Sequence, residues 1–290
     1  MVRRPLLALV ITAACAGATG PAHADTLLNS VEGGQHLASG SRYTAWSAPA
    51  GNGRFKLVLR GAGGRAEDAP IPTFGAPVDA AIGFTRHEFE GRERVAVYSR
   101  CEGRSTTRGC DVYQYSLGSR TERRVPKLAV AGVSETAPSI SFGSYAFVRR
   151  GGARPGTYVL PADGKADRLD GRLARETAIT EDRVVFLLPG DEIRWRPVFA
   201  GRVRTIGRAP AGRAFSLMAT RYRIGWLERR GGRVTARLSD RIDSGTATVR
   251  SGRRTLPAST TSASVSDSNL NRYLDATGLH LVSPNLFPST

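Results

Sequence analysis

The amino-acid sequence predicts an all-β fold, specifically a β-propeller of about six four-stranded blades. A short apolar segment centred on an aromatic residue recurs along the chain, and consecutive aromatics are 52, 49, 39, 40 and 47 residues apart. Four short strands need about 40–50 residues, so each repeat corresponds to one blade. The recurring aromatics are Trp46, Tyr98, Phe147, Phe186, Trp226 and, in a weaker copy, Tyr273.

Each aromatic segment begins a predicted hairpin. β-branched and aromatic residues dominate it, a turn follows, and a second apolar segment comes about 10–14 residues after the aromatic. The aromatic strands are Tyr43–Trp46, Val95–Tyr98, Tyr145–Val148, Val184–Leu187 and Ile224–Leu227. Their expected partners are Lys56–Leu59, Asp111–Tyr113, Thr157–Leu160, Pro197–Phe199 and Val234–Leu238. Charged segments that suit exposed outer strands follow at Thr121–Val125, Lys165–Leu169 and Arg202–Ile206.

The innermost strand of each blade should precede the aromatic strand. Short segments with small residues stand there: Asp79–Ile82, Pro138–Phe142, Thr177–Thr180 and Phe215–Met218. Two of their polar residues, Asp79 and Ser139, are predicted to line the central channel. The Ser/Thr-rich stretch 251–268 predicts a long surface loop, and Leu279–Val282 predicts a last strand that closes the ring with the segment near Leu27 and Leu28.

The first residues have the pattern of a secretory signal peptide. Arg3 and Arg4 precede a short apolar run, and Ala22-His23-Ala24 is a small-x-small cleavage site. We therefore expect a signal peptide over 1–24, a single propeller domain over 25–290, and a secreted or extracytoplasmic protein. The alternative is lipidation at Cys15, because the preceding residues resemble a bacterial lipoprotein box. In that case the protein would be anchored to a membrane.

The composition is strongly basic, with 42 Lys+Arg against 25 Asp+Glu and a formal net charge of +17. For an exported protein, such a charge favours lipid headgroups, acidic wall polymers or acidic proteins as partners, and we expect no nucleic acid. The arginines are scattered through every repeat, which also fits a generally basic surface. We expect a monomer that binds a protein or an anionic envelope polymer, with association at a membrane surface as a further option.

Two cysteines follow the leader, Cys101 and Cys110. Export permits a disulfide, and the intervening Gly/Ser/Thr-rich loop can close over it. In the chain-entropy model a loop of this size contributes roughly 2–3 kcal/mol. The histidines have no zinc spacing to these cysteines, so we expect a structural disulfide, no metal and no cofactor.

The chain contains no catalytic motif with the required context. His87 neighbours Glu88 and Glu90, which could form a carboxylate–imidazole pair. The many charges of this segment favour a solvated hairpin turn instead. Two arginine pairs occupy equivalent places after an aromatic strand: Arg149 with Arg150, and Arg229 with Arg230. They predict a basic rim on one face for an anionic partner, and the alternative is two solvated turns.

One repeat carries a resemblance to a known group. The segment Glu135–Val148, followed by Thr157–Leu160, resembles a blade of the TolB-like propellers, which alternate a Pro-led inner strand with two apolar strands. The Ser-Pro-Asp-Gly turn of that group is replaced here by Phe142-Gly143-Ser144. The resemblance implies a propeller and a scaffold or protein-binding role in the cell envelope, and it transfers no catalytic residue.

The sequence therefore predicts an exported, non-enzymatic binding or scaffold propeller of the bacterial envelope or extracellular space. The alternative is a propeller hydrolase or lyase that acts on extracellular glycans or peptides. An enzyme of that kind would need clustered acids, or a histidine beside a carboxylate, in its channel.

Overall fold

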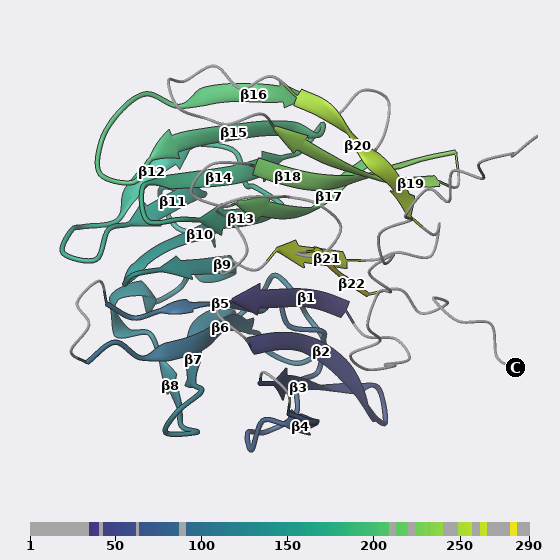
Figure 1. Ribbon diagram of the computed structural model, residues 1–290. Helices are drawn as coiled ribbons and strands as arrows, with labels where there is room; N and C mark the ends of the chain where they lie inside the picture. Colours follow the sequence, from purple (N-terminus) through teal and green to yellow (C-terminus); the bar gives the residue numbers. More distant parts are fainter. Residues whose placement is uncertain are drawn as a thin grey trace, which may run out of the picture.

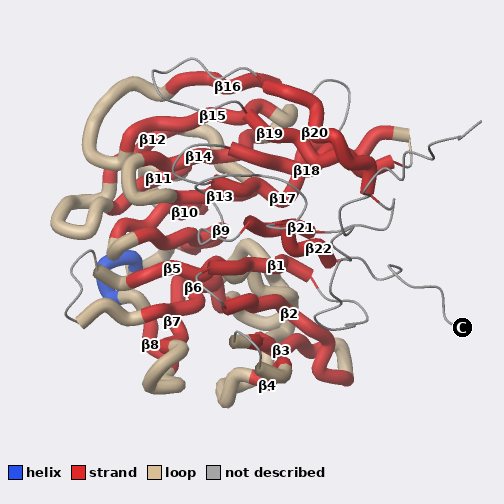
Figure 2. Tube along the Cα trace, in the orientation of Figure 1, coloured by secondary structure: helices blue, strands red, loops and turns tan. Residues whose placement is uncertain are grey.

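The computed structural model describes residues 35–40, 43–61, 64–86, 91–208, 213–219, 224–231, 233–239, 249–256, 262–265 and 279–282. Within them, strands dominate, and η1 (Pro126–Leu128) is a single turn of 3-10 helix (Figure 2). None of these residues forms a helix long and apolar enough to cross a membrane. The expected signal peptide with Cys15, the segment near Leu27, and Tyr273 lie outside the described residues.

The strands form five four-stranded antiparallel sheets and one two-stranded sheet (Figure 1). The first sheet contains β1 (Gln35–Gly40), β2 (Tyr43–Gly51), β3 (Arg54–Arg60) and β4 (Ala66–Asp68), and the second contains β5 (Ala81–Phe84), β6 (Arg94–Arg100), β7 (Asp111–Ser116) and β8 (Glu122–Arg124). The third contains β9 (Ser134–Ser141), β10 (Ser144–Arg150), β11 (Gly156–Leu160) and β12 (Asp167–Asp170), and the fourth contains β13 (Glu176–Ile179), β14 (Arg183–Leu188), β15 (Glu192–Pro197) and β16 (Arg204–Arg208). The fifth contains β17 (Arg213–Ala219), β18 (Ile224–Arg230), β19 (Arg233–Ser239) and β20 (Val249–Leu256), and the small sheet pairs β21 (Ser262–Val265) with β22 (Leu279–Val282).

The first strands of the sheets follow one another around a closed ring. Each of β1, β5, β9, β13 and β17 contacts the next, and β21 contacts both β17 and β1. Within every four-stranded sheet, the strands pair in chain order. The predicted all-β fold is confirmed, and the arrangement is that of propeller blades around an axis.

The core lies between neighbouring sheets. Phe147 on β10 packs with the second sheet, and its neighbours Ala146 and Val148 pack with the fourth. The aromatic strands are therefore buried on both faces. This explains why they appear in the sequence as apolar runs. Tyr98, Phe147 and Phe186 are fully buried, so these recurring aromatics form the core between blades and do not present a binding surface.

Carboxylates from one blade hold the inner strand of the next. Asp79, just before β5, accepts a hydrogen bond from the backbone N–H of Ala137 on β9 at 2.6 Å. Glu176 on β13 accepts from the backbone N–H groups of Ser216 and Leu217 on β17. Ala137 and Ser216 have positive φ angles of 49° and 54°. The strand pairing shifts register beside both residues, which marks a β-bulge at each. The N–H groups at these bulges do not bond to the neighbouring strand, and the carboxylates accept their hydrogen bonds instead.

The predicted aromatic strands and four of their five partners coincide with observed strands. The exception is Pro197–Phe199, because β15 comes earlier and only Pro197 belongs to it. This strand is rich in charged residues, and Glu192, Arg194 and Arg196 form ion pairs within the strand and with β12. The expected surface loop over 251–268 was also wrong, since that stretch contains most of β20 and all of β21.

Replacing Gly83 with Ala should destabilise the fold. A Cβ at this position on β5 would lie 2.3 Å from the carbonyl oxygen of Ile140 on β9, so the two inner strands would have to move apart. Overpacking of this kind costs about 1–3 kcal/mol. Chemical unfolding of Gly83→Ala should show this loss, whereas Gly118→Ala, which adds its methyl group to open space, should match the wild type. Equal stability of the two variants would contradict the close approach.

Candidate functional site

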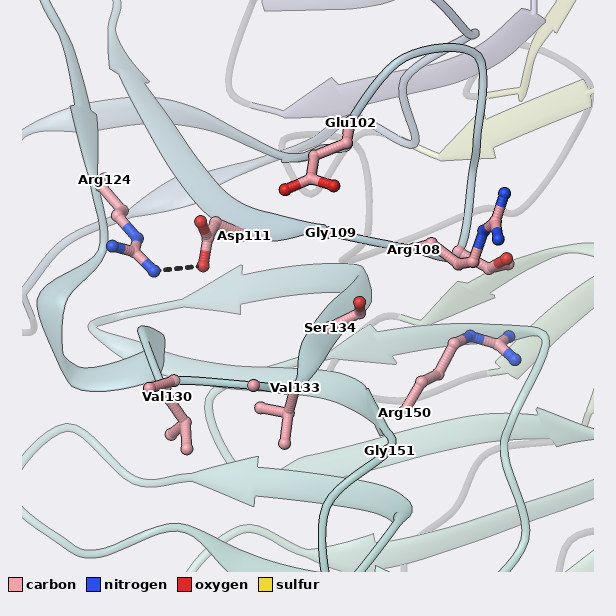
Figure 3. Close-up of a pocket in the computed structure, with 13 residues that line it drawn as sticks. Glu102, Arg108, Gly109, Asp111, Arg124, Val130, Val133, Ser134, Arg150 and Gly151 are labelled. Atoms are coloured by element: carbon pink, nitrogen blue, oxygen red, sulfur yellow. Dashed lines mark hydrogen bonds and ion pairs between the residues drawn. The ribbon is translucent and has the colours of Figure 1, made fainter.

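A pocket of about 540 Å³ lies between the second and third blades. Three connections form it: the β6–β7 turn, the segment between η1 and β9, and the end of β10 with the turn that follows (Figure 3). In an antiparallel four-stranded blade, the turn between the second and third strands and the connection to the next blade lie at the same end. The pocket is therefore on one loop-bearing face of the ring, where propellers can vary without disturbing their core.

The disulfide predicted from the sequence is present between Cys101 and Cys110, and the residues it encloses form one wall of the pocket. The backbone N–H of Cys110 donates to Ser134 Oγ at 3.3 Å, and the N–H of Glu135 donates to the Cys110 carbonyl at 2.8 Å. On its other side, the loop packs closely on Gly75, where a Cβ would meet the Gly103 carbonyl oxygen. The disulfide loop is thus held between two blade-to-blade connections.

The charges of the pocket are arranged on different sides. Asp111 and Arg124 form an ion pair on one side, and Arg108 and Arg150 lie on the other (Figure 3). Arg150 donates from Nε to Thr136 Oγ1 at 3.2 Å. Within the described part of the chain, no carboxylate pairs with Arg108 or Arg150. These two guanidinium groups are therefore available to an anion.

A buried carboxylate lies directly beneath this face. Glu135 follows the pocket residue Ser134, is fully buried, and accepts one hydrogen bond from Arg149 at 3.3 Å. Its other oxygen, Oε2, has no hydrogen-bond partner among the residues described. Burial raises the pKa of Glu135 to about 7, with a further upward contribution from Asp111, although the positive charge of Arg149 opposes both.

The structure separates the residues of the expected basic rim. Arg149 is largely buried, is paired with Glu135, and has its guanidinium 4.9 Å from the centre of the Tyr158 ring, so its role is structural. Arg150 lines the pocket. Arg229 lies 5.0 Å from the Phe215 ring centre, and Arg230 is exposed next to it. Of the four rim residues, Arg150 lines the pocket together with residues of the disulfide loop. A binding role for Arg150 stays a prediction.

The two residues expected to line the channel make contacts between blades. Asp79 also accepts hydrogen bonds from the backbone N–H and the hydroxyl of Ser99, in addition to Ala137. The Ser139 hydroxyl lies 3.0 Å from that of Thr177, on the next inner strand. Both side chains therefore link adjacent blades.

Sequence reasoning missed most of the pocket. Arg108, Val130 and Arg150 lie in three different segments, and nothing in their spacing marks them as neighbours. The proximity of the cysteine loop to the start of β9 depends on how two blades pack. His87 lies outside the described residues, and the side chains of His36 and His280 do as well. No group of three or more potential metal ligands occurs among the residues that the structure describes.

Comparison with known proteins supports the fold. No protein-family model matches the chain, and no curated protein matches it. The structure is similar to TolB from Acinetobacter baumannii, with a TM-score of 0.51 and 13% identity over 74% of this chain. The match spans 56% of the TolB chain, so little more than half of that protein has a counterpart here. The expected resemblance to TolB-like propellers is thus confirmed at the level of the fold.

Two further solved structures are more distant. Human WBSCR16 gives a TM-score of 0.46 and 9% identity, covering 77% of this chain and 68% of its own. A prolyl endopeptidase, from a study of two such enzymes and their inter-domain dynamics, gives 0.43 and 13% identity, covering 74% of this chain and 33% of its own. At these scores neither likeness supports a conclusion about this protein.

Glu135 should make stability depend on pH. Its raised pKa means that, between the ordinary value of about 4.3 and about 7, the folded protein keeps a proton that the unfolded chain has released. The free energy of unfolding should therefore fall as the pH rises through this window. Unfolding of Glu135→Gln, measured at several pH values, should show a flatter slope than the wild type. Glu102→Gln, which changes an exposed carboxylate, should keep the wild-type slope, and an unchanged slope in Glu135→Gln would contradict the assignment.

Proposed function

We propose that the protein is an exported, non-enzymatic binding propeller of the bacterial envelope or extracellular space, whose partner is a protein or an anionic surface. The main support for this proposal is the pocket beside the disulfide loop. There Arg108 and Arg150 line the pocket without carboxylate partners in the described residues (Figure 3). The fold would have six blades, with β21 and β22 as the described part of the sixth.

Apart from Glu135, the buried and half-buried carboxylates named below support a binding role over a catalytic one. Asp79 and Glu176 accept hydrogen bonds from the backbone of the next blade, and Glu228 accepts from Trp226 and Arg237. Asp170 and Glu192 form a closed set of ion pairs with Arg172 and Arg194. Each of these acids already has a structural partner. A glycan hydrolase or lyase, the alternative, would need carboxylates that face its substrate.

Export is supported by two features. The first residues have the n-region, apolar run and cleavage site of a secretory leader. The disulfide between Cys101 and Cys110 is a bond that persists in oxidising compartments. We propose cleavage after Ala24 and a monomeric mature protein, with lipid attachment at Cys15 as the alternative.

Charge reversal on the pocket face should weaken binding to anionic surfaces. Arg150 ends β10 and Arg230 ends β18, each the second strand of its blade, so Arg150, Arg229 and Arg230 lie at the same end of the blades as the pocket. Their triple replacement by Glu leaves the structural Arg149 in place and should remove most of the retention on phosphatidylglycerol vesicles or on acidic wall polymer. The binding is electrostatic, so added salt should weaken the retention of the wild type as well.

The matched control makes the same change of charge at the opposite ends of the blades. Arg65, Lys165 and Arg202 are exposed residues in turns between third and fourth strands. Their triple replacement by Glu should retain more binding than the pocket-face variant. Equal retention of both variants would show that net charge alone drives association, and would contradict a binding face.

A further inference from the structure

We propose that the pocket beside the disulfide loop binds a short segment of a partner protein in which a single Glu or Asp stands next to apolar side chains. Arg108 and Arg150 would hold the carboxylate. Val130 and Val133 would pack against the neighbouring apolar side chains. This inference rests on the proposed binding function and specifies its site and its ligand.

Arg108 and Arg150 indicate where the carboxylate of the ligand would bind. Arg108 and Arg150 lie on the same side of the pocket but come from different blades (Figure 3). Two neighbouring arginines, Arg124 and Arg149, already have carboxylate partners in Asp111 and Glu135. A guanidinium group prefers a planar carboxylate that it can bind through two hydrogen bonds. An acidic side chain from a ligand would give Arg108 and Arg150 the partner that Arg124 and Arg149 have internally.

Val130 and Val133, at the other edge of the pocket, indicate where an apolar side chain of the ligand would pack. Val130 is 40% exposed and is one of two large hydrophobic side chains that the described residues expose, Phe199 being the second. Val133 lies beside it, and Gly132 between them leaves space that no neighbouring atom fills. Covering such a surface with an apolar side chain removes it from water. A headgroup or a wall phosphate would use the arginines but would leave the valines exposed.

Acidic residues in the pocket limit how much negative charge the ligand carries. Glu102 lies across from Arg108 and Arg150, and Asp111 lies beside its partner Arg124 (Figure 3). A second acidic group in the ligand would approach Glu102 and be repelled. The pocket therefore favours one carboxylate among apolar neighbours over a continuous polyanion.

The disulfide holds the Arg108 wall in place. Arg108 is two residues before Cys110, and its backbone N–H donates to Ser105 Oγ at 2.9 Å within the closed loop. Because Cys110 is also bound to Ser134 and Glu135 on β9, the loop keeps Arg108 near Arg150. Loss of the disulfide should lower affinity without changing either arginine.

The test uses a capped peptide with one Glu between two Val residues and Gly/Ser flanks, titrated into the full mature protein and followed by amide chemical shifts. We expect saturable shifts at residues 102–109, 130–134 and 150–151. The same peptide with Gln in place of Glu should bind at least about tenfold more weakly, since a charged hydrogen bond is lost. The double variant Arg108→Ala and Arg150→Ala should weaken binding of the Glu peptide by a similar factor, and the double variant Cys101→Ser and Cys110→Ser should weaken it as well.

The control is the double variant Arg65→Ala and Arg202→Ala, which removes two exposed arginines from the opposite ends of the blades and should bind the Glu peptide like the wild type. Thermal unfolding checks that all variants are folded. Equal affinity for the Glu and Gln peptides, or undiminished binding by the Arg108/Arg150 variant, would overturn the proposal.

The same measurements separate this inference from the proposed function. If the peptide does not bind but retention on anionic vesicles still depends on Arg150, Arg229 and Arg230, the ligand is a polyanionic surface and only this inference fails. If neither peptide affinity nor retention on vesicles changes when Arg108, Arg150, Arg229 and Arg230 are replaced, both this inference and the proposed function fail.

Discussion

The inner ring is held by carboxylates that cross from one blade to the next. Asp79 binds the N–H of Ala137, and Glu176 binds the N–H groups of Ser216 and Leu217, in each case at a β-bulge. A buried N–H without a partner is costly, so the bulged strand is stable only while the preceding blade supplies an acceptor. Each of these bulges therefore fixes the spacing and the register of two blades at once.

The pocket depends on this ring. β9 begins at Ser134, which lines the pocket, and Asp79 fixes β9 three residues further on at Ala137. Cys110 is hydrogen-bonded to the same end of β9, so the disulfide loop takes its position from the strand. The binding face is thus built from loops whose ends are set by contacts between blades. Together with hydrogen bonds inside the disulfide loop, these contacts give the pocket a defined shape.

The arginines have two roles, in the framework and on the surface, and the net charge does not distinguish them. Many arginines belong to the framework. Arg194 and Arg196 on β15 pair with Asp170 and Asp167 on β12 of the preceding blade, and Arg92 covers the Phe84 ring at 3.7 Å. The others, such as Arg108 and Arg230, face solvent. Binding should therefore depend on a few positions.

The sequence predicted the fold class because the aromatic strands are buried on both faces, and this produces apolar runs that recur every 39–52 residues. It also placed the cysteine pair, whose partners are close in sequence. It did not predict β15, because Arg194 and Arg196 are charged residues whose ion pairs lie in another blade. The pocket could not be predicted for the same physical reason: Arg108, Val130 and Arg150 meet only through packing between blades. The pair Arg149 and Arg150 looks uniform in sequence, but the buried Glu135 gives the two side chains different roles.

A carboxylate of one blade holds the next blade and, through it, the pocket. Amide hydrogen exchange in Asp79→Ala measures this coupling. Exchange should be faster at Ala137 and at residues 130–134 and unchanged in the β14–β15 ladder. Protection at Ala137 should be intermediate in Asp79→Asn, which keeps one acceptor oxygen where the carboxylate offers one to Ser99 and one to Ala137. An Ala137 amide that stays as protected in Asp79→Ala as in the wild type would contradict the coupling.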